Sequence, residues 1–142
     1  MKILGIEHIG IAIDSMDEDA SFWKLLLNNC NTISENVNDQ KVITEIFDTG
    51  HGKIELLEAT SQDSPITKFI EKRGKGIHHF CLQVDDIQQA INELIEAGVE
   101  LIDKTPRVGA EGLMIAFIHP KSTGGVLVEL AEKQIKLNGQ KL

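Results

Sequence analysis

The chain has 142 residues, the size of one domain that can bury a core without disulfide bonds. Hydrophobic residues make up 42% and charged residues 25% of the sequence, which excludes a disordered chain. The formal net charge of -8 argues against nucleic acid as a partner, because binding to phosphates needs an excess of Lys and Arg. Because no apolar run approaches the roughly 20 residues that cross a bilayer, we expect no membrane partner.

The first residues of the chain and its two cysteines indicate the cellular compartment in which the protein is expected. Residues 1–5 lack the pattern of a signal peptide. Cys30 and Cys81 do not have the spacing of a metal or redox motif, so we expect reduced thiols. Together these features predict a cytoplasmic protein.

The first half of the chain predicts a strand, a helix and further strands. His8 opens an apolar strand, and Met16–Leu27 carries apolar residues at helical spacing. Ser15 stands at the N-cap position with a glutamate three residues later, as in a capping box. Strand-like stretches follow at 42–47 and 53–58.

A short helix then leads into a second copy of this pattern. Ser64 is its predicted N-cap and Pro65 its first residue. The second copy opens at His79, 71 residues after His8, and such a repeat shapes the whole architecture. It continues with a helix, for which Asp85 or Asp86 is the predicted N-cap, and with strand-like stretches at 99–102, 113–118 and 125–130.

The repeat predicts an α+β fold of two strand-helix-strand-strand-strand (βαβββ) modules. We expect a single domain over residues 1–142, because no linker is long or polar enough to separate two domains. Its predicted parts are a first module at about 1–60, a bridging helix at about 64–73, a second module at about 76–133 and a C-terminal tail.

The residues that could carry chemistry lie on the predicted strands. Side chains alternate between the two faces of a strand, so His8 shares a face with Gly10 and Ala12, while isoleucines line the other face. In the second module His79 shares a face with Cys81. One face of each strand therefore fits the core, and the face that carries the histidine suits the wall of a cavity.

The last strand of each module sets a carboxylate inside an apolar run, Glu55 in the first and Glu129 in the second. Buried carboxylates are normally paired or bound to a metal. Two imidazoles and two carboxylates could converge on one divalent cation such as Co2+, Ni2+, Zn2+ or Mn2+. Taken alone, a histidine on a strand is more often an ordinary hydrogen-bonded residue, and a glutamate on an edge strand is more often solvated. It is the repeat of both residue types that favours a metal site.

These modules resemble the vicinal oxygen chelate superfamily and, within it, the methylmalonyl-CoA epimerase family. The resemblance covers nearly the whole chain. It rests on residues 6–12, 54–58, 63–66, 76–79, 84–87, 106–110 and 119–130, of which the last two segments are the most specific to the epimerases.

The resemblance implies a cupped mixed β-sheet around a divalent metal ion, with Co2+ as the first choice and Mn2+, Ni2+ or Zn2+ as alternatives. The implied metal ligands are His8, Glu55, His79 and Glu129. It also implies a homodimeric isomerase that interconverts the epimers of methylmalonyl-CoA, an acyl-CoA thioester. Inversion through an enolate needs an acid/base group on each face of the intermediate. The resemblance assigns these roles to Glu45 and Glu129.

The role of two further residues and two alternative functions remain to be considered. Lys121 and Ser122 could contact the carboxylate or the phosphates of the substrate, although a plain turn explains them equally well. A glyoxalase I-type lactoylglutathione lyase would use the same four metal ligands. The fold would also serve a non-catalytic small-molecule-binding protein, which has no evident need for two buried carboxylates.

Overall fold

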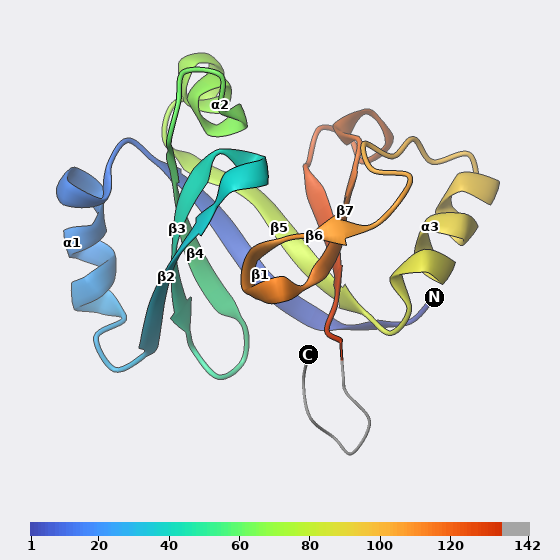
Figure 1. Cartoon of the computed structure of the whole chain (residues 1–142), viewed down its shortest axis with the longest axis horizontal. Helices are drawn as coiled ribbons and strands as arrows, with labels where there is room; N and C mark the ends of the chain where they lie inside the picture. The colour runs from blue at the N-terminus through green and yellow to red at the C-terminus, as the bar shows by residue number, and fades with distance from the viewer. Residues whose placement is uncertain (135–142) are drawn as a thin grey trace. The chain divides into compact units, whose positions relative to one another are not determined.

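The computed structural model describes residues 1–134, and these form two compact units (Figure 1). We call His8–His78 the N-terminal unit, and Met1–Glu7 together with the residues from His79 onward the C-terminal unit. The predicted tail at 134–142 lies outside the described residues except for Gln134. Within the described part, no helix has both the length and the apolar character of a membrane span.

The N-terminal unit contains a sheet in the order β2-β3-β4-β1, in which β1 runs parallel to β4 and the other pairs are antiparallel. Helix α1 covers one face of this sheet (Figure 1). The core between them contains Ile11, Ala20, Phe47 and Leu56. The elements are β1 (Ile3–Ile13), α1 (Met16–Leu26), β2 (Asn31–Val37), a short 3-10 helix η1 (Asn38–Gln40), β3 (Val42–Asp48), β4 (Lys53–Ala59) and α2 (Pro65–Arg73).

The C-terminal unit repeats this plan with strands in the order β5-β8-β7-β6. Strands β5 and β8 are parallel, and β8-β7 and β7-β6 are antiparallel. Helix α3 packs on one face, where its Ile87 and Ile91 belong to the same hydrophobic core as Val84 and Leu130 of the sheet. The elements are β5 (Gly76–Val84), α3 (Ile87–Glu96), β6 (Arg107–Val108), η2 (Ala110–Gly112), β7 (Met114–Ile118), η3 (Pro120–Ser122) and β8 (Val128–Glu132).

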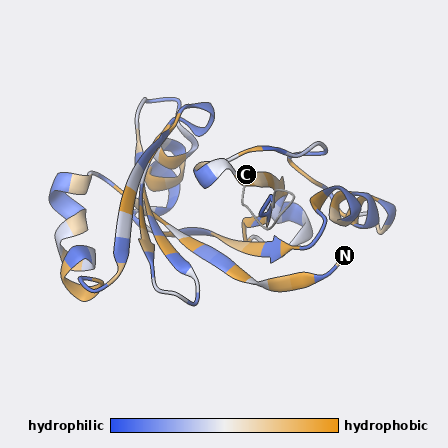
Figure 2. Cartoon of the chain, turned by 60° about the horizontal axis from the view of Figure 1, so that its bottom comes forward, coloured by the Kyte–Doolittle hydropathy of each residue, from blue (hydrophilic) through white to orange (hydrophobic). Residues whose placement is uncertain are grey.

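The predicted α+β class and the two βαβββ modules are confirmed by this order of elements. Hydrophobic and hydrophilic residues alternate along the strands, because one face packs on a helix (Figure 2). The alternation predicted for the first strand is correct: Ile11 and Ile13 enter the core with α1, and His8 points to the opposite face.

The predicted helix starts are confirmed, with one change in the capping of α1. The Ser15 side chain accepts a hydrogen bond from the Glu18 backbone N–H, but the Ser15 backbone N–H donates to the Asp19 carboxylate instead of to Glu18. Lys75 donates a hydrogen bond to Asp19 at 2.9 Å. This bond is the main reason why the pKa of Asp19 lies below its usual value. Ser64 caps α2, as predicted.

Two strand predictions need correction. The edge strand β2 was not predicted, because its residues are polar and mostly exposed and so lack a clear alternation. The predicted strand at 99–102 is not formed, since only Leu101 bridges to Ile118. The backbone N–H groups of Ile102 and Asp103 both bond to the Phe117 carbonyl, which interrupts a regular ladder. The two-residue strand β6 takes the edge position instead.

Candidate metal and substrate site

The N-terminal unit presents one buried His/Glu pair. His8 on β1 and Glu55 on β4 have side chains that are each only 5% exposed, with 3.1 Å between His8 Nδ1 and Glu55 Oε2. The register explains this contact, because Glu55 stands opposite Gly10, two residues after His8 on the same face. This face lies on the side of the sheet away from α1.

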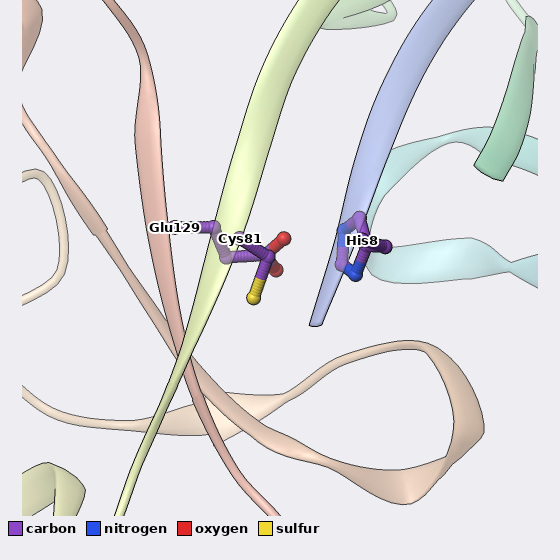
Figure 3. A group of neighbouring side chains, drawn as sticks. All are labelled: His8, Cys81 and Glu129. Carbon is purple, nitrogen blue, oxygen red and sulfur yellow. The ribbon is translucent and has the colours of Figure 1, made fainter. Parts of the chain in front are cut away.

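The C-terminal unit presents a second pair of the same kind. His79 Nε2 lies 3.1 Å from Glu129 Oε1, and both side chains are again 5% exposed. Cys81 and Glu129 are register partners on β5 and β8, and the Cys81 Sγ lies within 4.8 Å of a carboxylate oxygen of Glu129 (Figure 3). This face carries Phe117 and lies opposite α3. Each predicted module therefore supplies one imidazole and one carboxylate.

The two pairs meet the chemical needs of a divalent cation. Neutral imidazole nitrogens and carboxylate oxygens are the donors that borderline divalent ions take. Within each pair the imidazole nitrogen and the carboxylate oxygen are 3.1 Å apart, so the two donors of a pair lie close enough to bind the same ion. The pairs differ in one respect, since His8 presents Nδ1 and His79 presents Nε2 to its carboxylate.

Glu45 lies on a different face from the His8–Glu55 pair. In the antiparallel pairing of β3 with β4, Ile46 is opposite Glu55, and Glu45 is opposite Leu56 of the α1-facing core. Consistent with this, Glu45 is buried on the α1 side, with its Oε1 3.6 Å from Lys24 Nζ. Its predicted acid/base role gains no support from this position.

The predicted substrate-binding residues lie in the turn η3. The Ser122 hydroxyl accepts a hydrogen bond from the Glu100 backbone N–H at 2.9 Å. The Lys121 side chain is 77% exposed, and its Nζ lies 3.9 Å from a Glu100 carboxylate oxygen. Both residues therefore have a role in stabilising this turn, and their contact with a substrate stays a prediction.

Arg107 on β6 is a residue to which the sequence analysis assigned no role. Its guanidinium carbon lies 5.7 Å from the centre of the Phe117 ring, on the face of the sheet that carries His79 and Glu129. Asp103 holds it through a 3.0 Å bond to Nε. The sequence signal was its place in the segment 106–110, which carries part of the resemblance to the epimerases, but that segment alone gave its side chain no role.

Comparison with known proteins identifies the family to which this chain belongs. Residues 7–117 match the model of the glyoxalase/bleomycin resistance protein/dioxygenase superfamily. The chain belongs to this superfamily. Within the superfamily, it is 41% identical over 131 residues to the mitochondrial methylmalonyl-CoA epimerase of Dictyostelium discoideum, an alignment that covers 90% of this chain and 78% of that protein.

Solved structures place the chain in the same group of the superfamily. The methylmalonyl-CoA epimerase of Mycobacterium tuberculosis superposes with a TM-score of 0.84 and 33% identity, covering 92% of this chain and 88% of that one. A variant of the Streptomyces coelicolor epimerase in complex with 2-nitronate-propionyl-CoA gives a TM-score of 0.85 and 30% identity, covering 92% and 95%. The chain thus belongs to the family that contains these epimerases, which confirms the resemblance noted in the sequence.

Proposed function

We propose that this protein is a metal-dependent methylmalonyl-CoA epimerase. The observation that supports this most directly is the buried His/Glu pair in each unit, on the sheet face opposite the packed helix. The family relatives support the choice of reaction and of an acyl-CoA thioester as substrate. The cytoplasmic location expected from the sequence stays a prediction.

His8, Glu55, His79 and Glu129 would together hold one divalent ion, with Co2+ as our first choice and Mn2+, Ni2+ or Zn2+ as alternatives. The donor set supports this assignment, because two neutral imidazoles and two carboxylates bind a borderline dication and leave positions open. When bound, the ion supplies Lewis acidity for the thioester carbonyl oxygen, on which negative charge develops.

Inversion of the α-carbon needs one group that removes the proton and a second that returns it on the other face. We assign one of these roles to Glu129, as the family resemblance implies. For the other we favour Glu55 over Glu45, because Glu55 shares the face of His8 while Glu45 lies on the α1 side. In this assignment both carboxylates act on the proton in addition to holding the ion.

We also propose that the protein is a homodimer, with α1 as part of the interface. Three large apolar side chains of this helix, Phe22, Leu25 and Leu26, are more than half exposed, and a second copy of the chain would cover them. Light scattering after size exclusion should give twice the mass of 15.7 kDa for the wild type. The Leu25→Lys variant should give the monomer mass with an unchanged circular dichroism spectrum.

The decisive test follows the α-proton of a single epimer of methylmalonyl-CoA by NMR in D2O. Co2+-loaded protein should exchange this proton and produce the other epimer, which a coupled mutase reaction detects. Chelator-treated protein should do neither. His79→Ala should lose bound metal and activity while keeping its fold, so a metal-free His79→Ala protein with full activity would refute the metal assignment. Turnover of methylglyoxal with glutathione, without proton exchange, would identify a glyoxalase I-type enzyme instead.

A further inference from the structure

Arg107 is held rigidly by contacts within the C-terminal unit. Its Nε–H donates to Asp103 Oδ1 at 3.0 Å. The other carboxylate oxygen of Asp103 accepts a hydrogen bond from the Phe117 backbone N–H at 2.8 Å. The guanidinium is therefore tied through Asp103 to the backbone of β7. An arginine fixed in this way loses little side-chain entropy when it binds a ligand.

Phe117 connects this guanidinium to the His79–Glu129 pair. Its Cα is the register partner of Glu129 on β8. Its ring lies edge-on to the His79 imidazole with 5.6 Å between the ring centres, and the Arg107 guanidinium lies over the same ring. One aromatic side chain thus contacts both the positive group and the proposed metal ligand.

The remaining donors of Arg107 are available for a ligand. Only Nε takes part in the ion pair that the structure gives this residue within residues 1–134, and 35% of the side chain is exposed. Two lysines of this unit also have carboxylate partners, Lys133 with the buried Glu7 and Lys121 with the exposed Glu100. The two Nη groups form a planar fork that matches the two oxygens of a carboxylate.

We propose that Arg107 binds the free carboxylate of a malonyl-type thioester. This proposal rests on the proposed function, because it takes the His79–Glu129 pair as the place where the α-carbon reacts. In methylmalonyl-CoA the carboxylate is bonded directly to the α-carbon, whereas the phosphates lie at the far end of CoA. A carboxylate on Arg107 would thus keep the α-carbon on the face of Glu129.

The positive charge also has an electrostatic role in the reaction. Removal of the α-proton adds a second negative charge to an acyl group that already carries a carboxylate. A guanidinium paired with that carboxylate reduces the repulsion between the two charges, and the effect is larger on a partly desolvated face. Arg107 would therefore both select dicarboxylic acyl groups and favour the enolate.

Binding of malonyl-CoA and of propionyl-CoA to the metal-loaded protein tests the proposal by calorimetry. The wild type should bind malonyl-CoA more tightly. Arg107→Met should weaken malonyl-CoA binding about 10- to 100-fold and change propionyl-CoA binding less than about 2-fold. Lys104→Met is the matched control, because it removes an exposed cation three residues away and should change neither affinity. Arg107→Lys, which keeps the charge, should recover part of the malonyl-CoA affinity.

A truncated ligand separates the carboxylate from the phosphates. Malonyl-N-acetylcysteamine has the carboxylate and no phosphate, so Arg107→Met should weaken its binding by the same factor as that of malonyl-CoA. Equal loss for malonyl-CoA and propionyl-CoA, with no loss for the truncated thioester, would overturn the proposal in favour of a phosphate contact. If Arg107→Met keeps the wild-type preference for malonyl-CoA, Arg107 does not bind the carboxylate.

The outcome for Arg107 can be separated from the outcome for the proposed function. Suppose that the wild-type protein binds malonyl-CoA preferentially, that Arg107→Met removes this preference, and that the wild type does not exchange the α-proton. This result would refute the epimerase assignment and support the carboxylate site. A wild type that exchanges the proton while Arg107→Met keeps its full preference would refute the carboxylate site alone. Thermal melting of each variant verifies that it is folded. Asp103→Asn weakens the contact that positions Arg107, so it should lower the preference for malonyl-CoA, by a smaller factor than Arg107→Met does.

Discussion

Replacing Glu45 and Glu55 by glutamine, one at a time, tests which carboxylate moves the proton. Both substitutions remove a charge and preserve the shape of the side chain. Glu45 lies on the α1 side of the sheet beside Lys24, and Glu55 lies on the other side beside His8. We expect Glu55→Gln to lose epimerisation and Glu45→Gln to keep it.

The structure sets the size of each effect. The partner of Glu45 is an exposed Lys24 at 3.6 Å, and ion pairs of this kind contribute at most about 1 kcal/mol to stability. Glu45→Gln should therefore lower the melting temperature by roughly 3 °C or less. Its epimerisation rate should stay within about 3-fold of the wild type. Loss of a positioned acid/base group costs about 10²- to 10⁴-fold, which is the loss expected for Glu55→Gln.

Two NMR readouts distinguish loss of the base from loss of the metal. Exchange of the α-proton in D2O needs one base, and inversion needs two. Glu55→Gln should still exchange the proton of one epimer, through Glu129, while the other epimer fails to form. Metal content measured on the same sample must equal that of the wild type for this result to count. A folded, metal-loaded Glu45→Gln protein that loses 100-fold or more in inversion would refute the argument from strand faces.

Three stability predictions follow from the packing and the charges. Hydrogen bonds from Lys41 and from a serine hydroxyl lower the pKa of Asp63 from 3.8 to about 2, so Asp63 stabilises the fold above about pH 4, and this contribution is lost as the pH falls toward 2. Asp63→Asn should therefore lower the urea midpoint at pH 7 and lower it much less at pH 2; an equal loss at both pH values would contradict this. Ile91→Ala truncates a fully buried side chain of α3 and should cost about 2–5 kcal/mol in urea unfolding; a cost below about 1 kcal/mol, as at a surface site, would contradict this. Asp86→Ala removes the N-cap bond to the Gln89 N–H and should cost about 1 kcal/mol in the same assay, whereas Asp85→Ala should not remove this bond.

The elements and their faces follow largely from local patterns in the sequence. Alternation along the first strand correctly separated His8 from the isoleucines of the core, because side-chain direction in a strand depends only on position. The N-caps Ser15 and Ser64 act on backbone groups two or three residues away, so sequence spacing was enough to predict them. The polar edge strand β2 was missed because a strand with little burial leaves no alternation to detect.

The contacts that make up the candidate site required the tertiary structure. That each module carries a histidine and a carboxylate on buried strands is visible in the sequence, because the same residue types recur at matching places in the repeat. Only the strand register could show that Glu55 faces away from α1 and Glu45 faces toward it, because register depends on pairing between distant segments. Asp103 and Phe117 hold Arg107 on the sheet face that carries Glu129. Their contacts depend on the pairing of β6, β7 and β8. Local spacing encodes side-chain direction, whereas the meeting of distant side chains is decided by how strands pair.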